Sequence, residues 1–301
     1  MRKTTATFFV ILSCMLSVHA QLLWKVEGPG LKAPSYILGT YHLAPASFAD
    51  SIPGLKEALD ASQQVYGELE MSVASNPDSV SKMQRAMTLP QGLSLDSLLT
   101  SAQRERLNEF MRKYLGADMS HPMISPMKQM SPGALAIQFQ MLLALQVEKN
   151  FNSQELFDNH FQQWAKEQGK TTGGLETLDT QVRILYASTS TKRQVEQLMC
   201  LVNDAEYMKD LYRRTMEAFY TQSLPGIEKV LDEKRHNTCD ATPEEENALM
   251  YGRNAAWAAK LPALMQGGST FVAVGVGHLP GERGLLSLLR KQGYAVSPVT
   301  R

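Results

Sequence analysis

Two histidines stand at the ends of two similar apolar segments, one near each end of the sequence. Gly39 and His42 close the first segment, and Gly275 and His278 close the second, with two residues between glycine and histidine in each. An apolar run that stops at a glycine is typical of a buried strand, so both histidines are expected at strand ends. Imidazole titrates near neutral pH and is the commonest metal ligand, so a meeting of these ends predicts an acid–base or metal site. The alternative is that both histidines are buried, hydrogen-bonded and structural.

A third segment carries two carboxylates. Residues 64–71 predict a strand, and its period of two places Glu68 and Glu70 on one face. Burying a carboxylate is costly unless it is paired or metal-bound, so this pattern indicates either a site or a solvated edge strand. One of the two would bind a divalent ion or activate a water molecule, and the pattern does not decide between them.

Further polar residues accompany these segments. Arg253 and Asn254 lie in a predicted helix, where Arg253 could pair with a site carboxylate or stabilise a developing oxyanion. A helical arginine is more commonly solvated. Glu176 and Gln181 follow another predicted strand and indicate little on their own.

The start of the chain and its cysteines indicate its compartment. Residues 1–20 predict a signal peptide, with Arg2 and Lys3 before an apolar run that is short for a membrane span. We therefore expect export, to the periplasm or outside the cell; an uncleaved anchor is the alternative. Cys200 and Cys239 are the cysteines left in the mature chain, and in an oxidising compartment they predict a disulfide rather than two unrelated thiols.

Charge and hydropathy exclude two classes of protein. The formal net charge is zero, and loss of Arg2 and Lys3 would shift it to −2 because no acidic residue leaves with them. This balance gives no basic stripe for nucleic-acid binding. Beyond the leader, no segment predicts an integral membrane span in the mature chain.

The expected elements place strands at both ends of a helical middle. This order predicts an α/β (α+β) fold with a mixed central sheet, flanking helices and a helical insertion at about residues 75–165. We expect residues 21–301 to form one domain. The predicted strands cover 22–26, 35–38, 64–71, 171–175, 269–274 and 294–299, and the predicted helices 54–61, 101–115, 132–149, 154–168, 180–187, 192–221, 244–265 and 283–292.

In order and spacing, these motifs resemble the TraB/GumN superfamily, which also contains the PrgY and TIKI proteins. The resemblance covers most of the mature chain and implies a fold similar to erythromycin esterases and to the haem-binding ChaN group. It implies catalytic or metal positions at His42, Glu68 and His278, with Arg253 in support, and it favours Glu68 over Glu70. The other positions expected to support the site are Gly39, Glu70, Glu176, Asn254 and Gly275.

The leading functional hypothesis is an exported metal-dependent hydrolase that acts as a peptidase. The TIKI branch of the resembled family consists of metal-dependent proteases, which implies a divalent ion such as manganese, cobalt or zinc. A peptide or small molecule would be the substrate. One alternative is a metal-free, esterase-like hydrolase in which His42 acts as the base and Glu68 orients it. The other is a binding protein that holds haem or sequesters a peptide pheromone.

Overall fold

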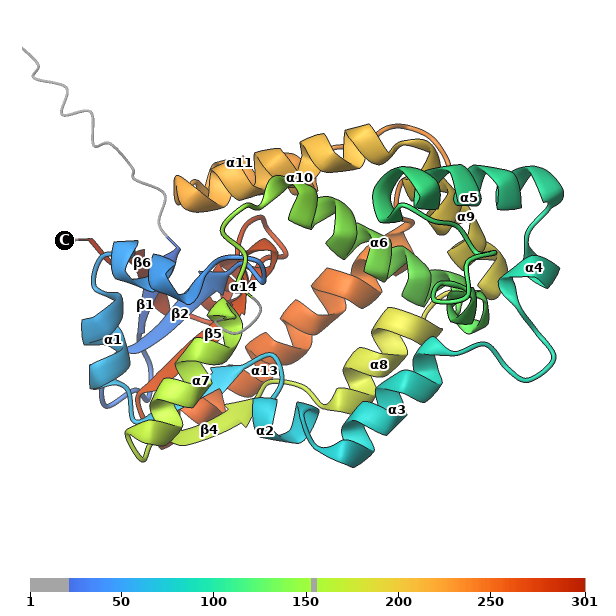
Figure 1. Ribbon diagram of the computed structural model, residues 1–301. Coiled ribbons are helices and arrows are strands. Elements are labelled where there is room, and N and C mark those ends of the chain that lie inside the picture. Colours follow the sequence, from blue (N-terminus) through green and yellow to red (C-terminus); the bar gives the residue numbers. More distant parts are fainter. Residues whose placement is uncertain (1–21, 153–155, 301) are drawn as a thin grey trace, which may run out of the picture.

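The computed structural model describes residues 22–152 and 156–300, so the predicted signal peptide lies outside the described residues. It contains a six-stranded mixed sheet with the order β4-β3-β5-β2-β1-β6. The sheet lies at the left of Figure 1. The mixed α/β class predicted from the order of elements is thereby confirmed. The strands are β1 (Leu23–Glu27), β2 (Ser35–Thr40), β3 (Gln64–Gly67), β4 (Thr171–Gly174), β5 (Thr270–Gly275) and β6 (Ala295–Pro298).

Four neighbouring strands of this sheet run in parallel. β2 pairs with β5, β5 with β3 and β3 with β4, all in parallel, whereas β1 is antiparallel to both β2 and β6. The carboxyl ends of β2, β3 and β5 therefore meet at one edge of the sheet. In open α/β sheets, this edge is where ligands bind.

Helices cover both faces of the sheet. On one face α7 (Phe157–Glu167) packs against β3, β4 and β5, and the ring centroid of Phe161 lies 5.7 Å from that of Phe271. On the other face lies α13 (Gly252–Gly267), whose Leu264 carbonyl accepts a hydrogen bond from the Gln64 side chain. Gln64 also bonds to Thr270. Because successive residues of a strand point to opposite faces, Thr270 and Phe271 lie on opposite faces of β5, and α13 and α7 therefore cover opposite faces of the sheet.

A second hydrophobic core lies apart from the sheet, among helices at the right of Figure 1. Its buried residues include Leu107, Phe139 and Leu198, from three different helices. The helices that build it are α4 (Leu95–Leu98), α5 (Ser101–Leu115), α6 (Pro132–Val147) and α9 (Thr191–Asn203), together with the first residue of α10 (Ala205–Tyr220). We call it the helical core, and the core around the sheet the sheet core. The helical core draws on α9 as well as on residues 75–165, and the division into one domain with an insertion stays a prediction.

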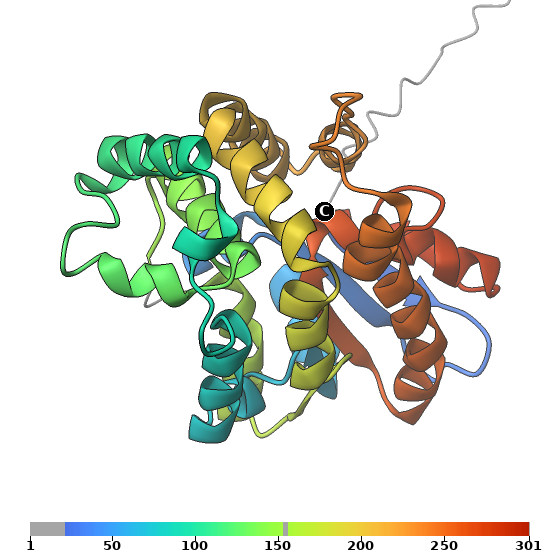
Figure 2. The same ribbon diagram turned by 90° about the vertical axis from the view of Figure 1, so that its right-hand side faces the viewer.

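The remaining helices complete the chain, and Figure 2 shows them from the side. Residues 192–221 form two helices rather than the one expected, because the backbone of Asp204 (φ −121°, ψ 38°) leaves the helical region. Residues 244–265 begin with a short α-helix and a π-helix before α13. These helices are α1 (Leu55–Ala61), α2 (Met71–Ala74), α3 (Pro77–Met87), α8 (Leu178–Ala187), α10 (Ala205–Tyr220), α11 (Leu224–Leu231), α12 (Pro243–Glu246) and α14 (Leu285–Lys291), with 3-10 helices η1 (Ala46–Ser51), η2 (Ser125–Gln129) and η4 (Val276–His278) and the π-helix η3 (Asn247–Tyr251).

Two further features bear on the compartment in which the chain folds. Cys200 in α9 and Cys239 form a disulfide, with Cα atoms 5.6 Å apart, which confirms the predicted pairing. Within the described ranges, none of the helices combines the length and the apolar character that crossing a membrane requires.

Candidate functional site

The two glycine–histidine motifs lie side by side in the sheet. Gly39 on β2 stands opposite Val274 on β5, and Thr40 stands opposite Gly275. A Cβ atom on Gly39 would lie 2.8 Å from Leu279 Cδ1 and 3.1 Å from the Cα of Val276, so the close approach of the two strand ends requires glycine. Both histidines therefore leave the sheet at the same edge.

His278 is buried directly after β5, with 5% of its surface exposed. Its Nδ1 lies 2.7 Å from Asn254 Oδ1, while the Asn254 amide donates to the carbonyl of Arg283. Asn254 therefore presents its oxygen to the ring, which places the proton on Nδ1 and leaves a lone pair on Nε2. Burial lowers the pKa of His278 to about 4, so the ring is neutral at neutral pH.

Glu68 follows the last residue of β3, rather than lying within a strand that reaches residue 71 as expected. Its Oε1 accepts the backbone N–H of Gly275 at 2.8 Å, and its Oε2 accepts from Arg253. Burial opposes ionisation of Glu68, but attraction to the cationic form that His278 takes at acidic pH, to Arg253 and to His42 outweighs burial and lowers the pKa of this carboxyl. Glu68 is therefore ionised at neutral pH.

Glu70 is the N-cap residue of α2. Its Oε1 accepts the Ser72 hydroxyl at 2.7 Å. The alternation expected over residues 64–71 is wrong here, because β3 ends at Gly67. A Cβ atom on Gly67 would lie 2.4 Å from Gln162 Nε2, so α7 closes in on the chain at this point. The structure thus places Glu68 next to the histidines and Glu70 outside that group.

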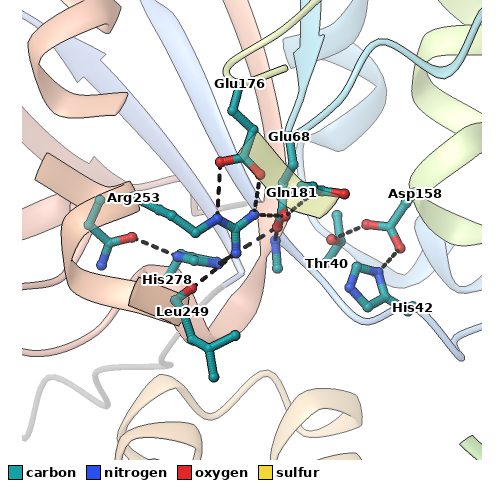
Figure 3. Close-up of polar contacts among 11 residues, drawn as sticks. Thr40, His42, Glu68, Asp158, Glu176, Gln181, Leu249, Arg253 and His278 are labelled. Atoms are coloured by element: carbon teal, nitrogen blue, oxygen red, sulfur yellow. Dashed lines mark hydrogen bonds and ion pairs between the residues drawn. The ribbon is translucent and has the colours of Figure 1, made fainter. Parts of the chain in front are cut away.

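Arg253 connects the carboxylates with His278, as Figure 3 shows. Its guanidinium donates to both oxygens of Glu176, at 3.0 and 2.7 Å, as well as to Glu68. Its Nη1 lies 3.1 Å from Nε2 of His278, whose lone pair accepts this hydrogen bond. The guanidinium carbon also lies 4.7 Å from the ring centre of Trp257, which adds a cation–π contact. Arg253 is the second residue of α13, which directly follows the π-helix, an irregularity that often marks functional sites.

His42 belongs to a second polar group, separate from the one around Arg253. Its Nδ1 lies 2.6 Å from Asp158 Oδ2 in the first turn of α7, and the Thr40 hydroxyl donates to the other oxygen of Asp158. Attraction to the Asp158 carboxylate, together with this hydrogen bond, raises the pKa of His42 to about 9. The imidazole is therefore protonated at neutral pH, although 69% of its side chain is exposed to the open cavity.

Asp158 is the site residue that the sequence did not reveal. It has no motif around it, and an acidic residue in the first turn of a helix is ordinarily explained by the helix dipole. Phe157 and Phe161 on the same helix are buried in the sheet core, and this packing directs Asp158 toward the end of β2. The pairing with His42 thus depends on tertiary packing across 116 positions of sequence.

The two polar groups share a cavity of about 500 Å³ at the carboxyl ends of the strands. His42 and Asp158 line it on one side, and Glu68 and Arg253 on the other. Gln181 also lines the cavity, with its Nε2 3.4 Å from Glu68 Oε2. His278 lies behind Arg253. The cavity thus brings an imidazolium and an ionised carboxylate to one space.

The donors at this site fit a divalent cation in part. His278 Nε2 lies 3.8 Å from Glu68 Oε1, slightly more than the roughly 3–3.5 Å that separates two ligands of one ion. His42 is occupied by Asp158, and Arg253 lies against both Glu68 and His278. Across residues 22–152 and 156–300, no three His, Cys, Asp or Glu side chains stand close enough together to hold a metal ion. Glu68 and His278 are therefore the two donors that could share a cation.

Comparison with known proteins identifies the class. The TraB/PrgY/gumN family model matches residues 22–298, and the chain belongs to this family. Metalloprotease TIKI2 of Danio rerio is 25% identical over 91% of this chain and 60% of its own length. Metalloprotease TIKI1 of Homo sapiens is 24% identical, over 91% of this chain and 61% of its own. The chain thus spans about 60% of the length of these relatives. No solved structure matches the chain, so the expected likeness to erythromycin esterases and ChaN is not confirmed.

Proposed function

We propose that this protein is a peptide-bond hydrolase that works in the cavity at the carboxyl ends of β2, β3 and β5. The observation that supports this most directly is the convergence of His42, Glu68 and His278 on one sheet edge. The metalloprotease names of its distant relatives support the same reaction class.

In this proposal Glu68 and His42 move the protons. Glu68 is ionised and accepts a proton from the water whose oxygen attacks the peptide carbonyl carbon. His42 is protonated and donates its proton to the amine nitrogen as the C–N bond breaks. The proton on Glu68 then restores His42, so the cycle balances. Two groups whose surroundings push their pKa values apart are suited to this division between base and acid.

Other residues of the chain position these two. Asp158 fixes the His42 ring through Nδ1, which leaves Nε2 to face the substrate. Arg253 and the Gly275 N–H hold both oxygens of Glu68. We propose Asn254 and Glu176 as the residues that orient His278 and Arg253, and Gly39 as the residue that lets the strand ends approach.

We further propose that Glu68 and His278 hold a divalent cation such as manganese, cobalt or zinc. When bound, such an ion would polarise the substrate carbonyl and lower the pKa of water. His42 is the third ligand that the family resemblance implies, but the Asp158 carboxylate keeps the ring protonated, which suits it better to donating a proton. Binding of the cation would require Arg253 to release Glu68, and that contact favours a second candidate, a metal-free hydrolase with the same proton transfers.

Elemental analysis together with peptide hydrolysis tests this proposal. The purified protein is compared with His42→Ala, Glu68→Gln and His278→Ala, and with His121→Ala, a histidine that does not line the cavity, as the control. The metal proposal expects a near-stoichiometric ion that Glu68→Gln and His278→Ala lose and His121→Ala retains. Hydrolysis that survives complete chelation would establish the metal-free mechanism. Full activity in folded His42→Ala would refute both.

We also propose that the chain is exported, to the periplasm or outside the cell. The Cys200–Cys239 disulfide supports this, because disulfides persist in oxidising compartments. The predicted signal peptide at residues 1–20 supports the same destination.

A further inference from the structure

The cavity has a second, apolar part that the proposed chemistry does not use. Met141 on α6 and Leu185 on α8 line it, although 45% and 41% of their surfaces are exposed. Exposed apolar side chains that face one cavity offer a surface for an apolar ligand group. The largest apolar side chains of this wall are Leu69, Met71, Met141, Phe151, Leu156, Ile184 and Leu185.

The charges around the cavity exclude a charged occupant for this part. The charged side chains that line the cavity are already paired, His42 with Asp158 and Glu68 with Arg253. A charged substrate group would lose its hydration against the apolar wall without gaining a partner. Glu176 behind Arg253 adds one more carboxylate, so an anionic group would also meet repulsion.

The size and composition of the wall indicate a side chain rather than a whole domain as the occupant. About 500 Å³ lies within the roughly 300–1,000 Å³ of small-ligand sites. Two of the apolar residues are methionines, whose flexible side chains adapt to ligands of different shape.

We propose that this part of the cavity binds a bulky apolar side chain of the peptide substrate, next to the bond that is cleaved. The inference rests on the proposed hydrolase function and names its substrate class. The site would prefer peptides with Leu, Phe or Met at one position beside the scissile bond over peptides with Lys or Glu there.

A series of internally quenched peptides that differ at one residue tests this preference. We expect kcat/KM for Leu or Phe to exceed that for Lys or Glu by ~10–200-fold, the range that small changes in an apolar pocket produce. Met141→Lys should remove most of this preference and improve the peptide with Glu. Met123→Lys is the matched control, because Met123 is 86% exposed and lies outside the cavity. Leu185→Asn is a second variant of the apolar wall, at a position about as exposed as Met141. Circular dichroism checks that each variant folds.

The outcomes separate this inference from the proposed hydrolase. Cleavage of every peptide at similar rates, unchanged in Met141→Lys, would overturn the apolar subsite and leave the hydrolase intact. If no peptide is cleaved, fluorescence anisotropy of the same peptides decides: binding that requires Leu or Phe and is lost in Met141→Lys supports the subsite without the hydrolase. Absence of both cleavage and binding, or binding of a fluorescent fatty acid alone, overturns the peptide subsite.

Discussion

Replacement of Gly39 by alanine tests the contact between the two glycine–histidine motifs. The added Cβ would lie 2.8 Å from Leu279 Cδ1, 2.9 Å from Val276 Cγ2 and 3.1 Å from Val276 Cα. Attractive carbon–carbon contacts lie near 3.5–4.0 Å, so all three distances are repulsive. The Leu279 side chain has rotamers to explore, but the Cα of Val276 moves only with the backbone. We expect a loss of about 1–3 kcal/mol in the free energy of unfolding, the usual cost of overpacking.

Tryptophan fluorescence in urea is a suitable assay for this change. The chain has three tryptophans: Trp257 is buried in the sheet core, and Trp24 and Trp164 pack against it. The signal therefore reports unfolding of the core to which Gly39 belongs. The midpoint should fall while the slope with urea stays constant, since the surface exposed on unfolding does not change.

Gly267→Ala is the matched control for this experiment. No atom lies within 4 Å of a Cβ built on Gly267, at the end of α13. Alanine favours the helix over glycine by up to about 1 kcal/mol, so this variant should be as stable as the wild type or slightly more stable. If Gly39→Ala were within about 0.5 kcal/mol of the wild type, the close packing of the strand ends would be refuted.

Three other perturbations have defined outcomes. Asp158→Asn should lower the pKa of His42 from about 9 toward its ordinary 6.5, because the neighbouring charge is removed; an NMR titration of the ring measures this, and an unchanged value would contradict the pairing. A hydrogen bond from an arginine of α9 is the main cause that lowers the pKa of Glu245. The ionised Glu245 therefore contributes to folding stability above pH 4.5, and this contribution is lost as the pH falls through the lowered pKa. Glu245→Gln should flatten that part of the acid-unfolding curve. Replacing Cys200 and Cys239 by serine should cost about 4 kcal/mol for the closed loop, measured by urea unfolding, and a loss under about 1 kcal/mol would mean that the disulfide hardly constrains the unfolded chain.

The sequence predicted those parts of the site that depend on local pattern. The strand ends at Gly39 and Gly275 were recognisable because an apolar run that stops at a glycine is typical of a buried strand that turns. The parallel pairing of these strands then brought His42 and His278 to one edge, although 235 residues lie between them in the sequence.

The other features of the site and the fold depend on tertiary packing, which no local sequence pattern indicates. Asp158 reaches His42 because two phenylalanines fix α7 on the sheet, and an isolated aspartate at a helix start gives no sign of this. Glu68 and Glu70 have different surroundings because β3 ends at Gly67, where Gln162 of α7 approaches the chain. Asp204 ends α9 although its neighbours continue the helical period, so the single helix expected there became two.

The two hydrophobic cores have a consequence for ligand binding. His42 and Glu68 follow strands of the sheet core, whereas Met141 belongs to α6, whose buried side chains pack in the helical core. A peptide that touches both walls binds only when both cores are intact, so it stabilises each of them against local opening. Amide hydrogen exchange in α6 should therefore slow when a peptide is held at the strand ends. In the proposed hydrolase, the stability of the helical core is thus coupled thermodynamically to the binding of substrate at the strand ends.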